Sequence, residues 1–482
     1  MSAVAAPITT ALDADGVLVA TIDMAERTMN VFSVELMDAL DALMDRVDAD
    51  PAVHSCVITS GKSSFLAGAD LEMVRGYGDA ARTRTHPQMF EMCGRLGRQF
   101  VRLEASAKPY VAAVNGLALG GGLELALACR MRLVADDPRL QLGVPEVRWG
   151  LLPGAGGTQR LPRMAGFEPA MKMLLSGQPV DPGTAMKLGI VSALVPASKL
   201  LDEARAVARA LHGSAYDPAL KFKHLAQTDV PAPGNGVSAA VAAKHGVSGT
   251  DYEFYPAYAA IVDSVLHGAR LSLAEATTVE MNNFLRLMFN PVAGRMVRTL
   301  FLERLRAEKE LAPPAGVAVE SLRVGPISES RAAWQAALGR LKLPQQTDDA
   351  LPPDTVEVTD RAGTVHSAAL RVTTDAPAAV AGAQLVLSPQ GPYGRVIEIA
   401  GAGDAQAATM AALAMHLRSL PWRTPGPVSR LATLQGRTLE EQAQQAAAWA
   451  PGSDPAFIDV AACLAGVTPA WSGGPLSWQA DR

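Results

Sequence analysis

The residues best suited to chemistry lie in three short segments: 65–70 (FLAGAD), 115–124 (NGLALGGGLE) and 145–158 (PEVRWGLLPGAGGT). Two of them hold a glutamate in apolar surroundings, Glu124 between two leucines and Glu146 after a Val-Pro pair. Burial raises the pKa of a carboxyl group, because desolvation disfavours its charged form, and this makes the group a useful proton donor and acceptor near neutral pH. Two such carboxylates could act on opposite ends of one water molecule.

The glycines of these segments could supply backbone N–H groups to the same place. A strand that runs into Gly-Gly-Gly at 120–122 and continues as a helix leaves N–H groups without partners at the helix start, where the helix dipole also favours negative charge. The Ala-Gly-Ala turn at 67–69 has small residues that let a ligand approach its backbone closely. The two segments together predict an oxyanion site.

Each of these features also has a purely structural interpretation. Glu124 can compensate the dipole at the start of its helix, and Glu146 can form a loop salt bridge. The glycines can serve tight strand-to-helix packing. Composition and spacing alone leave these interpretations open.

Length and composition set limits on the class of protein. With 482 residues the chain is too long for one ordinary core, so two or more folding units are expected. A net charge of −5 and 19% charged residues indicate no general attraction to nucleic acid or anionic membranes. A small or thioester-bound substrate fits this composition better than a polyanion.

The cysteines and the apolar runs predict the state of the thiols and the location of the protein. Four widely spaced cysteines, with no Cys-x-x-Cys pair, indicate reduced, buried thiols and no metal site. No segment approaches the ~20 apolar residues of a membrane span, and the N-terminus has no pattern of a secretory signal. We therefore expect no membrane span and a cytoplasmic location.

The first part of the chain alternates between strand and helix patterns. β-rich runs at 17–22, 53–59 and 111–114 are separated by helical patterns, which predicts an α/β unit. The first helix is expected to begin after Ser33.

The later part has a different pattern. Residues 229–251 are typical of a loop or insertion, and two helices broken at Asn290-Pro291 follow. Pro-rich linkers at 311–316 and 343–354 put a boundary near 310–320, and strand-like runs at 385–387 and 395–399 come after it.

Four motifs in order resemble the enoyl-CoA hydratase/isomerase (crotonase) family. They are residues 65–70, 108–116, 120–124 and 145–161, and the likeness extends over roughly 10–200.

More narrowly, the segments 136–138 (DDP) and 301–304 (FLER) resemble the α-chain of the multifunctional fatty-acid β-oxidation complex. In that α-chain a hydratase domain precedes a linker helix and a 3-hydroxyacyl-CoA dehydrogenase. The resemblance implies an α/β fold with a crotonase-like ββα spiral at 1–200, a helical linker packing on it at 201–315 and a small, degenerate dehydrogenase-like α/β region at 316–482.

The resemblance assigns roles to individual residues. Ala69 and Gly121 match the positions whose N–H groups hold the thioester oxygen, and Glu124 and Glu146 match the two catalytic carboxylates. Gly154 matches a residue that lines the water site.

The CoA-binding positions follow in the same way. Ala67, whose backbone would meet the adenine, Gly68, Asp70 and Leu71 are assigned to CoA binding.

The implied activity is hydration of 2-enoyl-CoA to 3-hydroxyacyl-CoA in fatty-acid β-oxidation. By resemblance, Glu124 acts chiefly on the water and Glu146 chiefly on the C2 proton. One alternative is a 3-enoyl-CoA isomerase or another acyl-CoA lyase of the same fold, and isomerisation also stands as a side activity. The other alternative is a non-catalytic scaffold subunit of a β-oxidation complex.

The C-terminal part lacks the pattern of a dinucleotide site. A G-x-G-x-x-G turn should follow the linker to hold the NAD pyrophosphate, but residues 322–330 read LRVGPISES. The pattern at Gly401-Ala402-Gly403 fails because position 406 is Gln. We expect no NAD site and no cofactor other than the acyl-CoA substrate itself, with a homo-oligomer or a thiolase subunit as the protein partner.

Overall fold

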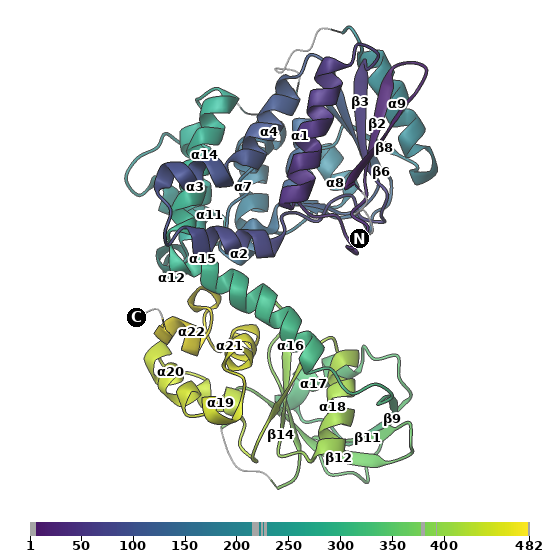
Figure 1. Cartoon of the computed structure of the whole chain (residues 1–482). Helices are drawn as coiled ribbons and strands as arrows, with labels where there is room; N and C mark the ends of the chain where they lie inside the picture. Colours follow the sequence, from purple (N-terminus) through teal and green to yellow (C-terminus); the bar gives the residue numbers. More distant parts are fainter. Residues whose placement is uncertain are drawn as a thin grey trace. The chain divides into compact units, whose positions relative to one another are not determined.

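The computed structural model describes residues 6–214, 221–222, 225, 229–376, 381–391 and 393–480. The chain forms two compact units, one extending to Gly294 and the other beginning at Arg295 (Figure 1). The domain limits expected from the sequence, 1–200, 201–315 and 316–482, stay predictions.

The first unit contains a six-stranded sheet. Its order is β1-β2-β3-β4-β6-β8, with β1 antiparallel to β2 and the other neighbours parallel. The strands are β1 Ile8–Leu12, β2 Val17–Ile22, β3 Ser55–Ser60, β4 Tyr110–Val114, β6 Met131–Ala135 and β8 Ala193–Val195. The strand runs expected at 17–22, 53–59 and 111–114 are confirmed, and the alternation with helices gives the α/β unit that was predicted.

Helices cover both sides of this sheet, α9 on one side and α1 on the other (Figure 1). Alternate residues of the parallel strands, such as Val19, Val57 and Val111, form a core with Leu200 and Ala204 of α9. Parallel strands are buried on both faces, which explains why their sequences are almost continuously apolar.

Helix α1 (Val34–Ala49) begins where the sequence predicts. Ser33 caps it by accepting a hydrogen bond from Leu36 N at 3.4 Å, and the buried face includes Leu40 and Val47. The α-helices that follow α1, up to residue 211, are α2 Leu71–Ala80, α3 His86–Cys93, α4 Arg95–Ala105, α5 Gly121–Ala128, α6 Gly157–Ala165, α7 Phe167–Ser176, α8 Pro182–Lys187 and α9 Leu200–Leu211.

Residues 229–251 are not the plain loop that the sequence predicts. They contain α11 (Val237–Lys244) and the start of α12 (Gly249–Phe254). Helix α11 is rich in alanine, the residue with the highest helix propensity, and Ser248 caps α12. Glycines next to both helices gave the segment its loop-like composition.

The break expected at Asn290-Pro291 is confirmed. Helices α13 (Pro256–Gly268) and α14 (Leu273–Met288) pack together, and α15 (Pro291–Val297) starts at the proline. Proline is tolerated in the first turn of a helix, where its missing N–H would have no partner.

The second unit contains a seven-stranded mixed sheet of order β10-β9-β11-β12-β13-β14-β15. Three neighbouring pairs are parallel and three antiparallel. The strands are β9 Val319–Val324, β10 Gln345–Thr347, β11 Thr355–Asp360, β12 Val365–Val372, β13 Gln384–Leu387, β14 Val396–Ala400 and β15 Leu420–Thr424. The runs expected at 385–387 and 395–399 are confirmed, whereas the linker predicted at 343–354 contains β10.

Helices pack around this second sheet. Trp334 of α17 and Met410 of α18 are buried against it, and the helices after β15 form a further core with Trp422. The helical segments are the π-helix Arg298–Glu303, α16 Arg304–Glu310, α17 Ala332–Leu338, α18 Asp404–His416, α19 Arg430–Leu434, α20 Leu439–Ala447, α21 Pro455–Leu464 and α22 Pro475–Ala480. The resemblance of this region to a dehydrogenase stays a prediction.

Candidate active site

Glu124 lies in the first turn of α5 and is buried, with 2% of its surface exposed. Its Oε1 accepts hydrogen bonds from Ala155 N at 2.8 Å and Gly157 N at 2.7 Å. A β-carbon at Gly157 would lie only 2.9 Å from the same oxygen, so glycine is required for this approach. Within the part of the chain that the structure describes, no hydrogen bond reaches Oε2, which leaves that oxygen for another group.

Glu146 lies in a 3-10 turn, η1 (Pro145–Trp149), and its side chain reaches the start of α5. A β-carbon at Gly120 would collide with Glu146 Oε1, and Gly120 also has the left-handed φ of +52° that favours glycine. Glu146 Oε2 is buried and has no hydrogen-bond partner among the described residues. The predicted carboxylate Glu146 therefore lies at the start of the helix that carries Glu124, and the charge of Glu124 acts on it.

Burial and mutual repulsion set the protonation of the pair. Burial raises the pKa of Glu124 to about 6, although the amides of Ala155 and Gly157 lower it in part by stabilising the charged form. Burial also raises the pKa of Glu146 well above its usual range, and the nearby charge of Glu124 raises it further. Burial thus favours the protonated form of each carboxyl group, and the charge of Glu124 adds to this effect at Glu146.

The two predicted oxyanion amides belong to neighbouring backbone segments. Gly68 and Gly120, the residues before Ala69 and Gly121, lie side by side, because a β-carbon at Gly120 would be 3.6 Å from Gly68 Cα. Phe32 pairs with the Ala69 segment and also packs against Gly121. Among the described residues the amides of Ala69 and Gly121 have no hydrogen-bond acceptor, so both remain available to a ligand.

The residues assigned to CoA binding lie at the start of α2. Ala67 N donates to Asn30 O, and Asp70 caps α2 while pairing with Arg27 at 2.5 Å. Leu71 is the first residue of that helix. These contacts fix the backbone, and the CoA-binding roles stay predictions.

Gly154 lines a cavity of about 210 Å³ bounded by α3, α4 and α14. Phe90, Gly97, Glu280 and Met281 also line it. The role of Gly154 in holding water stays a prediction.

The sequence analysis missed Glu280, a third buried carboxylate at this site. It lies in α14, is 1% exposed, and accepts hydrogen bonds from Gly156 N at 2.6 Å and Thr158 N at 2.9 Å. Burial raises its pKa to about 8, helped by the charge of Glu124. Its neighbours in sequence are an apolar helix face, so no local signal marks it.

A buried ion-pair cluster contacts the turn that contains Ala155, Gly156 and Gly157. Arg160, fully buried, donates to Ala155 O at 3.0 Å and pairs with Glu104 at 3.0 Å. Lys221 also pairs with Glu104, and burial lowers the pKa of Lys221 to about 7. The turn is thus held by a charged side chain at its Ala155 carbonyl group as well as by Glu124.

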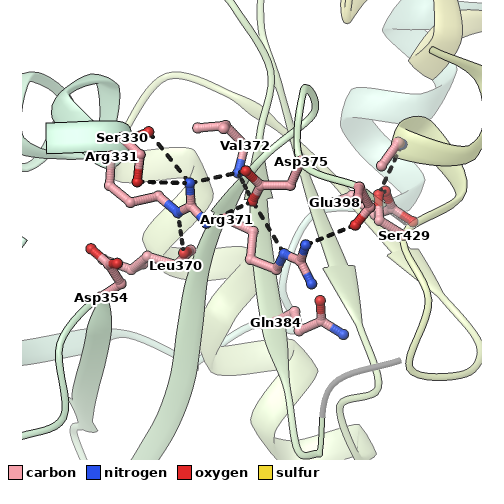
Figure 2. A network of polar contacts seen from close by, with 12 residues as sticks. Ser330, Arg331, Asp354, Leu370, Arg371, Val372, Asp375, Gln384, Glu398 and Ser429 are labelled. Atoms are coloured by element: carbon pink, nitrogen blue, oxygen red, sulfur yellow. Dashed lines mark hydrogen bonds and ion pairs between the residues drawn. The ribbon is translucent and has the colours of Figure 1, made fainter. Parts of the chain in front are cut away.

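A different polar network of the second unit is centred on Arg331, Arg371 and Asp375, and Asp354 lies in the same region (Figure 2). Asp354 accepts hydrogen bonds from Ser328 N and Ser328 Oγ, both at 2.8 Å. Arg331 and Arg371 both pair with Asp375. A carboxylate therefore sits at the first strand-to-helix turn of this unit, and the two nearby arginines share one carboxylate, Asp375.

Several further expectations concern the described residues as a set. The four cysteines are free and buried, as predicted. In the described ranges no cluster of three or more His, Cys, Asp or Glu residues could hold a metal ion. None of the helices described here is long and apolar enough to cross a membrane.

Comparison with known proteins matches the first part of the chain. Residues 15–241 match the family model described as enoyl-CoA hydratase/isomerase. A fatty acid oxidation complex subunit alpha of Shewanella frigidimarina is 34% identical over 304 residues, covering 63% of this chain and 42% of the relative. The corresponding subunit of Shewanella halifaxensis is 38% identical over 301 residues, covering 61% of this chain and 41% of the relative. The chain thus spans about two fifths of the length of these relatives.

Among solved structures, an enoyl-CoA hydratase/isomerase from Xanthobacter autotrophicus Py2 covers 62% of this chain and 95% of its own, with 23% identity and a TM-score of 0.45. The family match confirms the resemblance carried by the four sequence motifs. Residues 15–241 are therefore similar to the enoyl-CoA hydratase/isomerase family, and the α/β fold of the first unit agrees with this similarity.

Proposed function

We propose that this chain is an enoyl-CoA hydratase that adds water across the 2,3 double bond of 2-enoyl-CoA thioesters. The observation that carries the proposal is the pair of carboxylates Glu124 and Glu146, which lie near enough for the charge of Glu124 to raise the pKa of Glu146. Each has an oxygen without a hydrogen-bond partner among the described residues. In the complex with substrate, these oxygens would face the attacking water molecule and the reacting carbon atoms.

The reaction places charge where the free amides can stabilise it. Attack of water at C3 of the conjugated thioester moves electron density to the carbonyl oxygen. The N–H groups of Ala69 and Gly121 would donate to that oxygen as its charge develops. Such preorganised donors need no rearrangement during the reaction, which is the source of their catalytic effect.

The protonation states give each carboxylate a task. Glu124, with its pKa at about 6, is mostly ionised at pH 7 and can accept a proton from the attacking water. Glu146, with its pKa raised further by Glu124, keeps a proton that it can deliver to C2. This assignment agrees with the roles expected from the family resemblance.

An isomerase reaction is the second candidate, because the family description names both activities. Moving a double bond from C3 to C2 needs one carboxylate to carry the proton and needs no activated water. Glu146 alone, with its unpartnered Oε2, meets that requirement.

The substitution Glu124→Gln separates the two reactions. We expect it to lower hydration of crotonyl-CoA about 1,000-fold, the usual scale for loss of a general base, while isomerisation of a 3-enoyl-CoA falls much less. Absorbance of the conjugated thioester follows both reactions. Equal loss of both would contradict the division of roles, and hydration that survives unchanged would contradict the proposal itself.

We further propose that the second unit has no NAD site at the turn after β9. A dinucleotide pyrophosphate binds at such a turn through free N–H groups. Here Ser328 N donates to the Asp354 carboxylate, which would also repel a phosphate. Titration with NADH, followed by its fluorescence, should show no saturable binding. Saturable binding that Asp354→Arg abolishes would contradict this proposal.

The setting of the reaction is proposed on the same basis. The relatives are named as fatty acid oxidation complex subunits, so we propose an acyl-CoA substrate of fatty-acid β-oxidation and a cytoplasmic location. A thiolase subunit or a second copy of this chain is the proposed protein partner. Size-exclusion chromatography with light scattering, with and without a thiolase of the same source, tests these partners.

A further inference from the structure

Four consecutive backbone amides at the start of α6 are divided between two carboxylates. Residues 155–158 each donate one hydrogen bond, and the acceptor alternates along the chain. Glu124 accepts from the first and third residues at 2.8 and 2.7 Å. Glu280 accepts from the second and fourth at 2.6 and 2.9 Å. The two side chains therefore share the four amides of one turn.

Glu280 is well anchored for this task. It is buried on α14, and Thr158 Oγ1 donates to the same Oε2 that accepts from the Thr158 amide. Gly156 has a φ of +102°, a left-handed conformation that only glycine adopts without strain. Without the Glu280 carboxylate, two buried N–H groups would lose their acceptors and this turn could relax to a different conformation.

We propose that Glu280 is a positioning residue for hydration, which fixes the turn 155–158 so that its alternate amides hold Glu124 in place for the attacking water. The inference rests on the proposed hydratase function. Glu280 touches no reacting atom in this account and acts through Glu124. A shift of about 1 Å in a catalytic group can lower a rate about 100-fold, so small movements of this turn would be costly.

The charge of Glu280 adds an effect that a purely structural residue would not have. An ionised Glu280 raises the pKa of Glu146, in addition to the larger effects of burial and Glu124. Removal of this charge therefore lowers the pH at which Glu146 loses its proton. The charged groups around Glu280 are Glu124, Glu146, Arg98, Arg160 and Arg163.

Two substitutions and one control test the proposal in the full chain. Glu280→Ala removes both acceptors, and we expect kcat for crotonyl-CoA hydration to fall at least about tenfold while KM changes less than about threefold. Glu280→Gln keeps one acceptor, so kcat should fall less, and the alkaline limb of the kcat/KM profile should move to lower pH. Glu253→Gln changes an exposed glutamate of α12 and should behave as wild type.

The results separate this proposal from the proposed function. If both Glu280 variants melt as wild type and keep its kcat and alkaline limb, the positioning role is wrong. If Glu280→Ala does not fold, the kcat and pH profile of Glu280→Gln decide. If wild type hydrates no enoyl-CoA, the proposed function fails, and a crystal structure of either variant then decides. In that structure, the proposal predicts that Glu124 loses one of its two hydrogen bonds from the backbone amides of Ala155 and Gly157. Two unchanged hydrogen bonds would overturn the proposal.

Discussion

Glu398 in the second unit and Glu146 in the first both hold carboxylate oxygens away from solvent, and burial raises the pKa of both. Glu398 accepts four hydrogen bonds, which come from Thr424 Oγ1, Ser429 Oγ, Arg430 N and Leu431 N. Glu146 keeps a buried oxygen with no partner among the described residues.

The difference teaches how to separate a structural carboxylate from a catalytic one. A buried carboxylate with all its partners supplied by the protein stabilises the local fold. A buried carboxylate with an open position costs stability, and such a cost is typical of a site that waits for a ligand. Burial and pKa alone would not distinguish Glu398 from Glu146.

The substitution Glu146→Gln is the strongest test of the difference between Glu146 and Glu398. The amide has no proton to deliver to C2, so we expect hydration and isomerisation both to fall about 1,000-fold or more. Thermal unfolding should be unchanged, because the protonated acid and the amide that replaces it are both neutral and nearly the same shape. A variant that unfolds early and keeps its activity would show that Glu146 is structural, like Glu398.

The substitution Gly120→Ala tests the contact between the two catalytic segments. Its β-carbon would collide with Glu146 Oε1 and would need an unfavourable positive φ. We expect kcat for hydration to fall about 100-fold because Glu146 is displaced. Gly249→Ala is the matched control, since a β-carbon there meets no atom within 4 Å. Equal activity of the two variants would contradict the placement of Glu146.

The complementary test is Glu398→Gln in the second unit. The amide cannot accept all four hydrogen bonds, so at least one buried donor loses its partner, at a cost of about 2 kcal/mol in the free energy of unfolding of this unit. Hydratase activity should stay at the wild-type level. Glu320→Gln, which changes an exposed glutamate of β9, is the control for denaturant unfolding.

The pH dependence of Glu398 has a defined sign. Burial raises its folded pKa above the unfolded value, so the native state favours the protonated form. Its contribution to stability is therefore full below the unfolded pKa and is lost as the pH rises through the folded pKa. The free energy of unfolding of Glu398→Gln should not show this loss as the pH rises. A wild-type chain that becomes more stable relative to Glu398→Gln as the pH rises would contradict the assignment.

The smallest predicted effect is the acid limb of hydration. Glu124 must be ionised to accept a proton, and its pKa is about 6, so kcat/KM should rise with pH and level off above that value. Below it, each pH unit should lower kcat/KM about tenfold. Stopped assays from pH 5 to 9 measure this limb. A profile that is flat down to pH 5 would show that Glu124 is not the base.

Much of this site could be predicted because its parts are local. The helix start at Gly121 and the apolar setting of Glu124 are visible within a few residues of sequence. Glu280 could not be found in that way, because it meets Thr158 across 122 residues of sequence and its neighbours Met281 and Phe284 indicate only a core-facing helix. Only tertiary packing reveals its role.

The fold shows the same limit. Three of the parallel strands, β2, β3 and β4, were predicted from their apolar runs, which burial on both faces explains. Helix α11 was missed because flanking glycines outweighed its alanines in composition. In the second unit, the position of Asp354 at the turn after β9 depends on a contact with Ser328 that no motif encodes.

The most direct test of the account is hydration by the wild-type chain. Purified protein is mixed with 2-enoyl-CoA thioesters of increasing chain length at pH 7.5, with and without NAD, and absorbance of the conjugated thioester is followed. The account predicts rapid loss of absorbance at one or more chain lengths, formation of the 3-hydroxyacyl-CoA, and no production of NADH. Full retention of absorbance at every chain length would contradict it.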